Sequence, residues 1–246
     1  MTYTIQLVGI LLLVVTFCGN PTDAVDRRIV NGTTAADKKY PYQVSLRNVN
    51  NLHFCSGSIL NTRWILTSTV CLTFATNFTI VAGSNNLNGS GDTYQAASYL
   101  FHPLYNSRPF EYDALLVNTT TPIVYSTRIQ PVVLTPLFPI VGAVAVISGW
   151  GTNDIASQIT FNELRDLNTT VLSQTTCQSR FGGIFNVTSS VICTFVAKGG
   201  SCYFDYGAPI TVCNIQFGIV RNPFCGVFPD LHTPISNVYS WIISII

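Results

Sequence analysis

The feature that most constrains the fold is a succession of short segments rich in Val, Ile, Thr and aromatic residues, separated by Gly, Pro and Asn. Such segments favour strands, and their spacing is typical of β-barrels. No long helical period intervenes before Thr233–Ile242, which we expect to be a helix with an apolar side of Val238, Trp241 and Ile242. The sequence therefore predicts an all-β fold with a C-terminal helix, and the expected strands include Gln43–Arg47, Trp64–Ser68, Phe78–Ala82, Ala114–Asn118, Val144–Ser148, Thr170–Ser173 and Gln216–Val220.

The first residues are not expected to belong to that fold. Ile5–Phe17 is an uncharged, mostly apolar run of 13 residues, too short to span a bilayer and of the length of a signal-peptide core. Small residues around Cys18 and Gly19 offer a cleavage point, although the usual positive residue near Met1 is lacking. We therefore expect a signal peptide at 1–19 and a secreted, extracellular protein.

Composition limits the partners. The net charge is +1, which argues against nucleic acid or a charged membrane surface as the main partner. Only 9% of the residues are charged, against roughly a quarter in an ordinary globular domain. Surface polarity must then come from Ser, Thr and Asn or from attached sugar, and six N-x-S/T sequons offer candidate glycosylation sites at Asn31, Asn77, Asn88, Asn118, Asn168 and Asn186.

Cysteine usage indicates the same compartment. The chain has eight cysteines, and Cys18 would leave with the signal peptide. No C-x-x-C occurs and the three histidines lie far apart, so the pattern favours a disulfide framework over a zinc site. We expect no metal and no cofactor. Without Cys18 seven cysteines remain, so at least one of them has no partner within this set.

Several motifs then follow one another in a specific order. Asp26–Gly32 contains a dibasic pair before Ile-Val-Asn-Gly, and it is followed by Pro-Tyr-Gln-Val-Ser-Leu. Further landmarks lie at His53–Leu60, Trp64–Cys71, Asp113–Leu116, Ser148–Thr152 and Cys202–Pro209. Together they resemble the chymotrypsin-like (S1) serine proteases over essentially the whole mature chain.

That resemblance implies a domain layout. It implies two packed six-stranded antiparallel β-barrels, a trypsin-like fold, over residues 29–246, with the crossover between the barrels near 128–136. Residues 20–28 would be a short pro-segment, removed by cleavage after Arg28. The new amine of Ile29 would then reach the carboxylate of Asp205 and order the neighbouring loops.

The same resemblance implies that the catalytic residues are replaced. In the loop Gly199–Pro209 the framing residues are kept, but Tyr206 stands at the nucleophile position and Phe204 at the position of the oxyanion-hole glycine. Val70 stands where the family has its general-base histidine, and Asp113 retains the carboxylate. A phenol with no adjacent base is a poor nucleophile at neutral pH, and a β-carbon penalises the positive φ that glycine allows. We therefore expect degenerate triad and oxyanion positions.

The substrate pocket differs as well. Gly200 lies where trypsin-like enzymes carry an acid at the pocket floor, and Arg221, Asn222 and Pro223 replace the strand that pairs with a substrate backbone. Pro223 has no amide donor to offer. We expect Tyr206, Arg221 and Asp230 to occlude the cleft in part, with Arg221 and Asp230 as a candidate ion pair.

The family pattern also implies the disulfides. Its pairs would be Cys55–Cys71, Cys177–Cys193 and Cys202–Cys225, which leaves Cys213 unpaired, as a buried thiol or for intermolecular pairing. A three-bridge framework is similar to that of the trypsin-like mite allergens of group 3.

The functional expectation is a catalytically inactive serine protease homologue. The chain most closely resembles the inactivated protease paralogues of the scabies mite, which are related to those allergens. This resemblance implies binding to host complement proteins and inhibition of the complement cascade. An alternative is an arthropod protease homologue that acts as a cofactor in an innate-immune or clotting cascade, and a remote alternative is a residual hydrolase.

Overall fold

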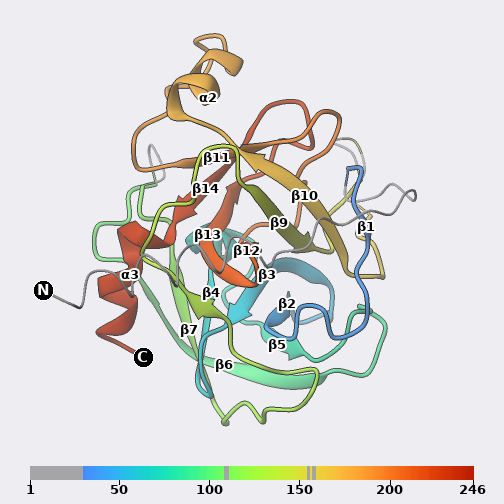
Figure 1. The fold of residues 1–246 in the computed structure, drawn as a ribbon. Helices are drawn as coiled ribbons and strands as arrows, with labels where there is room; N and C mark the ends of the chain where they lie inside the picture. Colours follow the sequence, from blue (N-terminus) through green and yellow to red (C-terminus); the bar gives the residue numbers. More distant parts are fainter. Residues whose placement is uncertain (1–29, 108–110, 154–155, 157–158) are drawn as a thin grey trace, which may run out of the picture.

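The computed structural model describes residues 30–107, 111–153, 156 and 159–246. It consists of two antiparallel β-barrels, one above the other in Figure 1, with a C-terminal helix beside them. The two barrels and the C-terminal helix are those that the sequence and the resemblance predict. The expected signal peptide, the pro-segment and Ile29 lie outside the described residues.

The first barrel closes in the order β2-β3-β4-β7-β6-β5. Its interior is filled by Val, Leu, Ile and Phe side chains that alternate with outward-facing residues along the strands. Its strands have the bounds Gln43–Arg47 (β2), His53–Ile59 (β3), Trp64–Thr67 (β4), Thr79–Ala82 (β5), Asp92–Phe101 (β6) and Leu115–Thr119 (β7).

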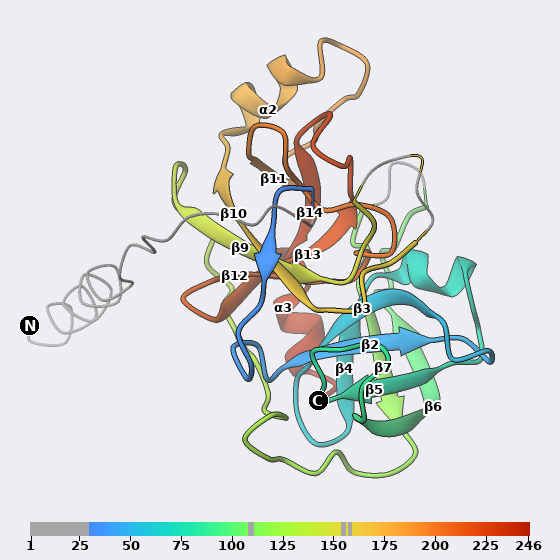
Figure 2. The same ribbon diagram turned by 90° about the vertical axis from the view of Figure 1, so that its right-hand side faces the viewer.

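The second barrel closes through β9, β10, β11, β14, β13 and β12. Two short strands extend it: β1 pairs with β10, and β8 pairs in parallel with β13. In Figure 2, β1 is the blue arrow near the start of the described chain, and it lies against β10. The bounds are Thr33–Thr34 (β1), Val133–Leu134 (β8), Val144–Gly149 (β9), Arg165–Val171 (β10), Ile192–Phe195 (β11), Pro209–Val212 (β12), Ile215–Asn222 (β13) and Asp230–Pro234 (β14).

Helices are few. The C-terminal helix α3 spans Ile235–Ile243 and buries Ile235, Val238 and Ile242 in the core between the barrels. It begins later than the sequence predicts, because Thr233 and Pro234 pair with β13 as the end of β14. The helix α2, Gln174–Arg180, was not predicted. The expected strand Thr170–Ser173 ends earlier, at Val171, and the Ser173 side chain caps the helix at the N–H of Thr176.

Three disulfides lie within the described residues, and they are the pairs that the resemblance implies: Cys55–Cys71, Cys177–Cys193 and Cys202–Cys225. The prediction that Cys213 is unpaired is wrong, because Cys213 is disulfide-bonded. The other six described cysteines pair with one another, so its partner lies outside the described residues.

Candidate active-site remnant

The segment Ser68–Cys71 links the three positions that the resemblance assigns to a catalytic triad. It leaves β4 and forms a short 3₁₀ helix, η1, over Thr69–Thr73. The Thr69 N–H donates to Asp113, and Cys71 Sγ lies 3.8 Å from the carbonyl oxygen of Tyr206. Val70 lies between these two contacts in the chain, so the fold brings Val70, Asp113 and Tyr206 to one place. The side chain of Val70 can neither accept nor donate a proton.

The carboxylate of Asp113 is fully buried. The Ser68 hydroxyl donates to Oδ2 at 2.5 Å and the Thr69 N–H donates to Oδ1 at 2.6 Å. Burial raises the pKa of Asp113, while these two hydrogen bonds and the positive charge of Arg221 oppose that rise. Asp113 thus accepts hydrogen bonds from the two residues that precede Val70. Its carboxylate stabilises the start of η1, and there is no imidazole at Val70 for it to orient.

Arg221 is a buried cation next to this carboxylate. It is only 2% exposed, and its Nε donates to the side chain of Asn222. Burial lowers the pKa of Arg221, and the charges that oppose this are those of Asp113, Glu111 and Tyr105. The candidate ion pair of Arg221 with Asp230 is not among the ion pairs of the described residues, and the Asp230 carboxylate accepts from the N–H groups of Ser201 and Phe224 instead. The groups whose charge acts on Arg221 are Asp113 and its chain neighbours Glu111 and Tyr105. The sequence alone did not reveal this, because these residues lie far from Arg221 in the chain.

Tyr206 is turned toward the first barrel. Its ring lies 5.6 Å from that of Phe74, and its side chain packs against the core of the first barrel. Burial raises the pKa of Tyr206, so the phenol is protonated at neutral pH. An ordinary tyrosine is already protonated at neutral pH, and the raised pKa makes the phenolate fraction of Tyr206 smaller still, so Tyr206 is a weaker nucleophile than an ordinary tyrosine.

The backbone at Phe204 keeps the conformation that the resemblance assigns to glycine. Its φ is +73°, in the left-handed region that costs a non-glycine residue about 1–2 kcal/mol. Within the described part of the chain, the N–H groups of Phe204 and Tyr206 donate to no backbone or side-chain acceptor. The penalty that the β-carbon imposes does not move the backbone of Phe204 out of positive φ, because the surrounding loop is fixed on both sides.

One of these fixing contacts involves His53. Its Nε2 lies 3.2 Å from the carbonyl oxygen of Phe204, and its Nδ1 lies 2.9 Å from the hydroxyl of Ser45. Asp205 fixes the other side of Phe204, as described below. The sequence does not reveal this role of His53, since a contact across 151 positions leaves no local pattern.

The three histidines are all engaged away from a nucleophile. Burial lowers the pKa of His53 and of His232 to about 3, and it lowers that of His102 as well. His232 Nε2 contacts the hydroxyl of Thr194 at 2.8 Å, and the His102 ring stacks on Tyr112. A general base must lie within hydrogen-bond reach of the group that it deprotonates. In the described residues no histidine does so for Tyr206.

Asp205 organises the loop from inside. Its carboxylate is fully buried and accepts from the N–H groups of Gly151 at 2.8 Å and Cys202 at 2.9 Å. A β-carbon at Gly149 or Gly151 would overlap this carboxylate, so the Ser-Gly-Trp-Gly segment is shaped around it. Burial raises the pKa of Asp205 to about 7. Its expected partner, the amine of Ile29, lies outside the described residues.

Asp230 fills the floor of the expected pocket. It is 3% exposed and accepts from the N–H groups of Ser201 at 2.6 Å and Phe224 at 2.9 Å. Burial raises its pKa to about 7. A β-carbon on Gly200 would lie 3.0 Å from the Asp230 carboxylate, so that carboxylate takes up the space beside the glycine. What remains is an open hollow of about 160 Å³ lined by Tyr203, Pro223, Phe224, Cys225, Val227 and Phe228.

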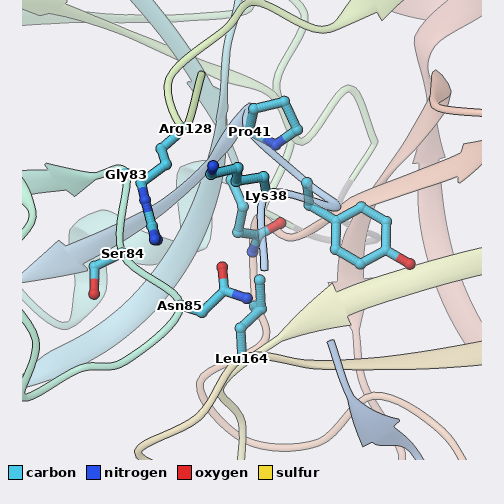
Figure 3. A pocket seen from close by; sticks show the side chains of 9 residues that line it. Lys38, Pro41, Gly83, Ser84, Asn85, Arg128 and Leu164 are labelled. Carbon is cyan, nitrogen blue, oxygen red and sulfur yellow. The ribbon is translucent and has the colours of Figure 1, made fainter. Parts of the chain in front are cut away.

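A second crevice lies where the start of β2 meets the loop after β5. Figure 3 shows Lys38, Arg128 and Asn85 around it, and its volume is about 10 Å³. That is room for about one water molecule. Arg128 is also paired with Asp37 at 2.6 Å. The crevice is thus no substrate site.

The predicted glycosylation sites are exposed or half-buried. The sequon asparagines Asn77, Asn88, Asn168 and Asn186 are exposed, whereas Asn31 and Asn118 are half-buried. Over the described ranges, no cluster of His, Cys, Asp and Glu has the make-up of a metal site. No helix in the same ranges is long and apolar enough to cross a membrane.

The double barrel and the clustered triad positions define the class of protein, that of the two-barrel serine proteases. The family model described as Trypsin matches residues 29–242. Serine protease 1 of Rattus norvegicus is 33% identical, with 88% of this chain and 89% of the relative covered. Trypsin II-P29 of Gallus gallus is also 33% identical, with 90% of each chain covered.

A solved structure gives the same result. Neuropsin, a serine protease expressed in the limbic system of mouse brain, superposes with a TM-score of 0.79 at 25% identity, covering 87% of this chain and 97% of that one. The chain belongs to the trypsin family of serine proteases.

Proposed function

We propose that this chain is a catalytically inactive, secreted member of the trypsin family that acts by binding protein partners. The observation that carries the proposal is the pair Val70 and Tyr206, which stand beside a retained, buried Asp113 where a base and a nucleophile are required. Without the base, the other groups of a triad lose nearly all of their effect. The scaffold around them is kept, including the Asp205 contacts.

The partner that we propose is a host complement protein, so that binding inhibits the complement cascade. The proposal rests on the resemblance to the inactivated protease paralogues of the scabies mite. A binding role is also supported by a run of exposed apolar side chains in one segment, since such groups mark interaction sites when they gather. These are Val133, Leu137, Phe138, Ile140, Val141 and Val144, each between 53% and 70% exposed.

Inactivity is tested with a panel of peptide substrates. The chain is prepared with and without tryptic cleavage after Arg28, and the activating trypsin is then removed and blocked. We expect no turnover in either sample. Turnover that persists with the blocked trypsin and is lost in Tyr206→Phe would overturn the proposal of an inactive protein and favour a residual hydrolase.

Binding is tested by a pull-down from mammalian plasma, identified by mass spectrometry, beside a complement-lysis assay. The bait starts at Ile29, and a variant with Leu137, Phe138 and Ile140 changed to Ser serves as comparison. Val227→Ser, exposed on the second barrel, is the matched control. We expect complement proteins on the bait and on the control, with reduced lysis. Absence of both effects would remove the complement assignment while leaving the inactivity result intact, and capture from arthropod haemolymph would favour the cascade-cofactor alternative.

A further inference from the structure

A polar groove lies on the first barrel, and its lining includes none of the triad positions. It has a volume of about 330 Å³ and includes Asn77 in its wall together with Asn48, Asn51, Thr79, Thr93 and Gln95. Ligand pockets in proteins start at about 300 Å³. The groove is therefore large enough for a small ligand, although it is open to solvent.

The register of the strands explains why these side chains gather. Thr79 lies opposite Gln95, and Thr93 is two residues from Gln95 on the same strand. Since successive side chains of a strand point to opposite faces, these three lie on the outer face, while Ile80 and Tyr94 point into the barrel core. The hairpin that follows β2 adds Asn48 and Asn51 at one end.

The chemistry of the groove selects a neutral, hydroxyl-rich ligand. None of the described side chains that line it is charged, which disfavours an anion or a cation. Side-chain amides and hydroxyls both donate and accept hydrogen bonds, and the exposed Val49 offers an apolar contact at the rim. This combination suits a sugar that carries an acetamido group.

Asn77 connects this groove to a covalent modification. It is the asparagine of the sequon Asn77-Phe78-Thr79, it is exposed, and it lines the groove itself. Phe78 is 2% exposed in the barrel core, so it anchors the sequon at the groove wall. A glycan on Asn77 would begin inside the groove rather than extend freely into solvent.

We propose that Asn77 is N-glycosylated and that the first N-acetylglucosamine of this glycan lies in the groove, against Thr93, Gln95 and the 48–51 hairpin. In the modification, the amide nitrogen of Asn77 forms a bond to the anomeric carbon of the sugar and loses one proton. The bond from that carbon to the diphosphate of the activated oligosaccharide donor breaks. The glycan then covers outward-facing backbone of the first barrel that would otherwise be in water.

The test begins with occupancy. The full chain is secreted from eukaryotic cells, and peptides are mapped after enzymatic removal of N-glycans in ¹⁸O water, which marks each occupied asparagine. We expect Asn77 to be occupied. Thr79→Ser retains both the sequon and a hydroxyl, and it should stay occupied, whereas Thr79→Val should not. An unoccupied Asn77 in the wild-type chain would overturn the proposal.

The position of the first sugar in the groove is tested by hydrogen exchange. Glycans are trimmed to one N-acetylglucosamine, and this form is compared with Asn77→Gln. We expect loss of amide protection over 48–52 and 92–96 in Asn77→Gln and no change there in Asn186→Gln, whose sequon lies on the other barrel. Gln95→Ala should keep occupancy but lose part of the protection. Equal exchange in the trimmed wild type and Asn77→Gln would show a glycan that does not lie in the groove.

Discussion

Phe204 offers a direct test of the loop geometry. Because its φ is +73°, a glycine variant should be more stable than an alanine variant, which is the reverse of the usual order of stability. Phe204→Ala and Phe204→Gly remove the same ring from the edge of the first-barrel core. They differ only in the β-carbon. At positive φ that atom costs about 1–2 kcal/mol, whereas glycine loses about 0.4–1 kcal/mol to the greater freedom of the unfolded chain. The glycine variant should be more stable by about 0.8 kcal/mol at the midpoints of these two ranges, and by about 1.6 kcal/mol at most.

The assay is urea unfolding of the disulfide-intact protein, followed by circular dichroism. A difference of 1 kcal/mol corresponds to about 2–4 °C in Tm for a chain of this size. The matched control is Ser240, exposed in α3, where alanine should be more stable than glycine by up to about 1 kcal/mol. If Phe204→Ala is at least as stable as Phe204→Gly while the helix pair behaves normally, the backbone at Phe204 is not in the left-handed region and the loop is not held as described.

The remaining predictions concern the buried carboxylates. Burial raises the pKa of Asp205 and Asp230 to about 7, so the folded state binds more protons than the unfolded state between about pH 4 and 7. The free energy of unfolding should therefore fall as pH rises through that window. Urea titrations from pH 4 to 8 measure the slope of the free energy of unfolding against pH, and a flat profile would contradict the raised pKa values. Asp230→Asn should reduce that slope, with Asp37→Asn on the surface as control. Ser68→Ala should destabilise the protein by about 1.5–3 kcal/mol, since it removes a hydroxyl that donates to the buried carboxylate of Asp113; a loss no larger than that of Ser240→Ala would show that this hydrogen bond contributes little.

The sequence alone determined the class of fold and the residue types at the positions that the resemblance assigns to the triad. Strand composition is a local property, so segments such as Gln43–Arg47 and the terminal helix could be predicted from residue type and period. The order of the motifs carried the family, and the residue types at Val70 and Tyr206 were visible without coordinates. Cysteine pairing followed for the three bridges whose family positions are occupied.

Only the tertiary structure decided how these residues interact. The sequence suggested an ion pair between Arg221 and Asp230. In the structure Asp230 accepts from two backbone N–H groups, and the negative charge of Asp113 acts on Arg221 and opposes the fall in its pKa that burial causes. Phe204 keeps a strained φ because two distant residues hold its loop: His53 contacts the Phe204 carbonyl oxygen, and the Gly151 N–H donates to Asp205. The groove at Asn77 likewise exists only because strand register sets three outward side chains beside a hairpin. Residue type sets what a side chain can do, whereas long-range packing sets its partners, its burial and hence its charge.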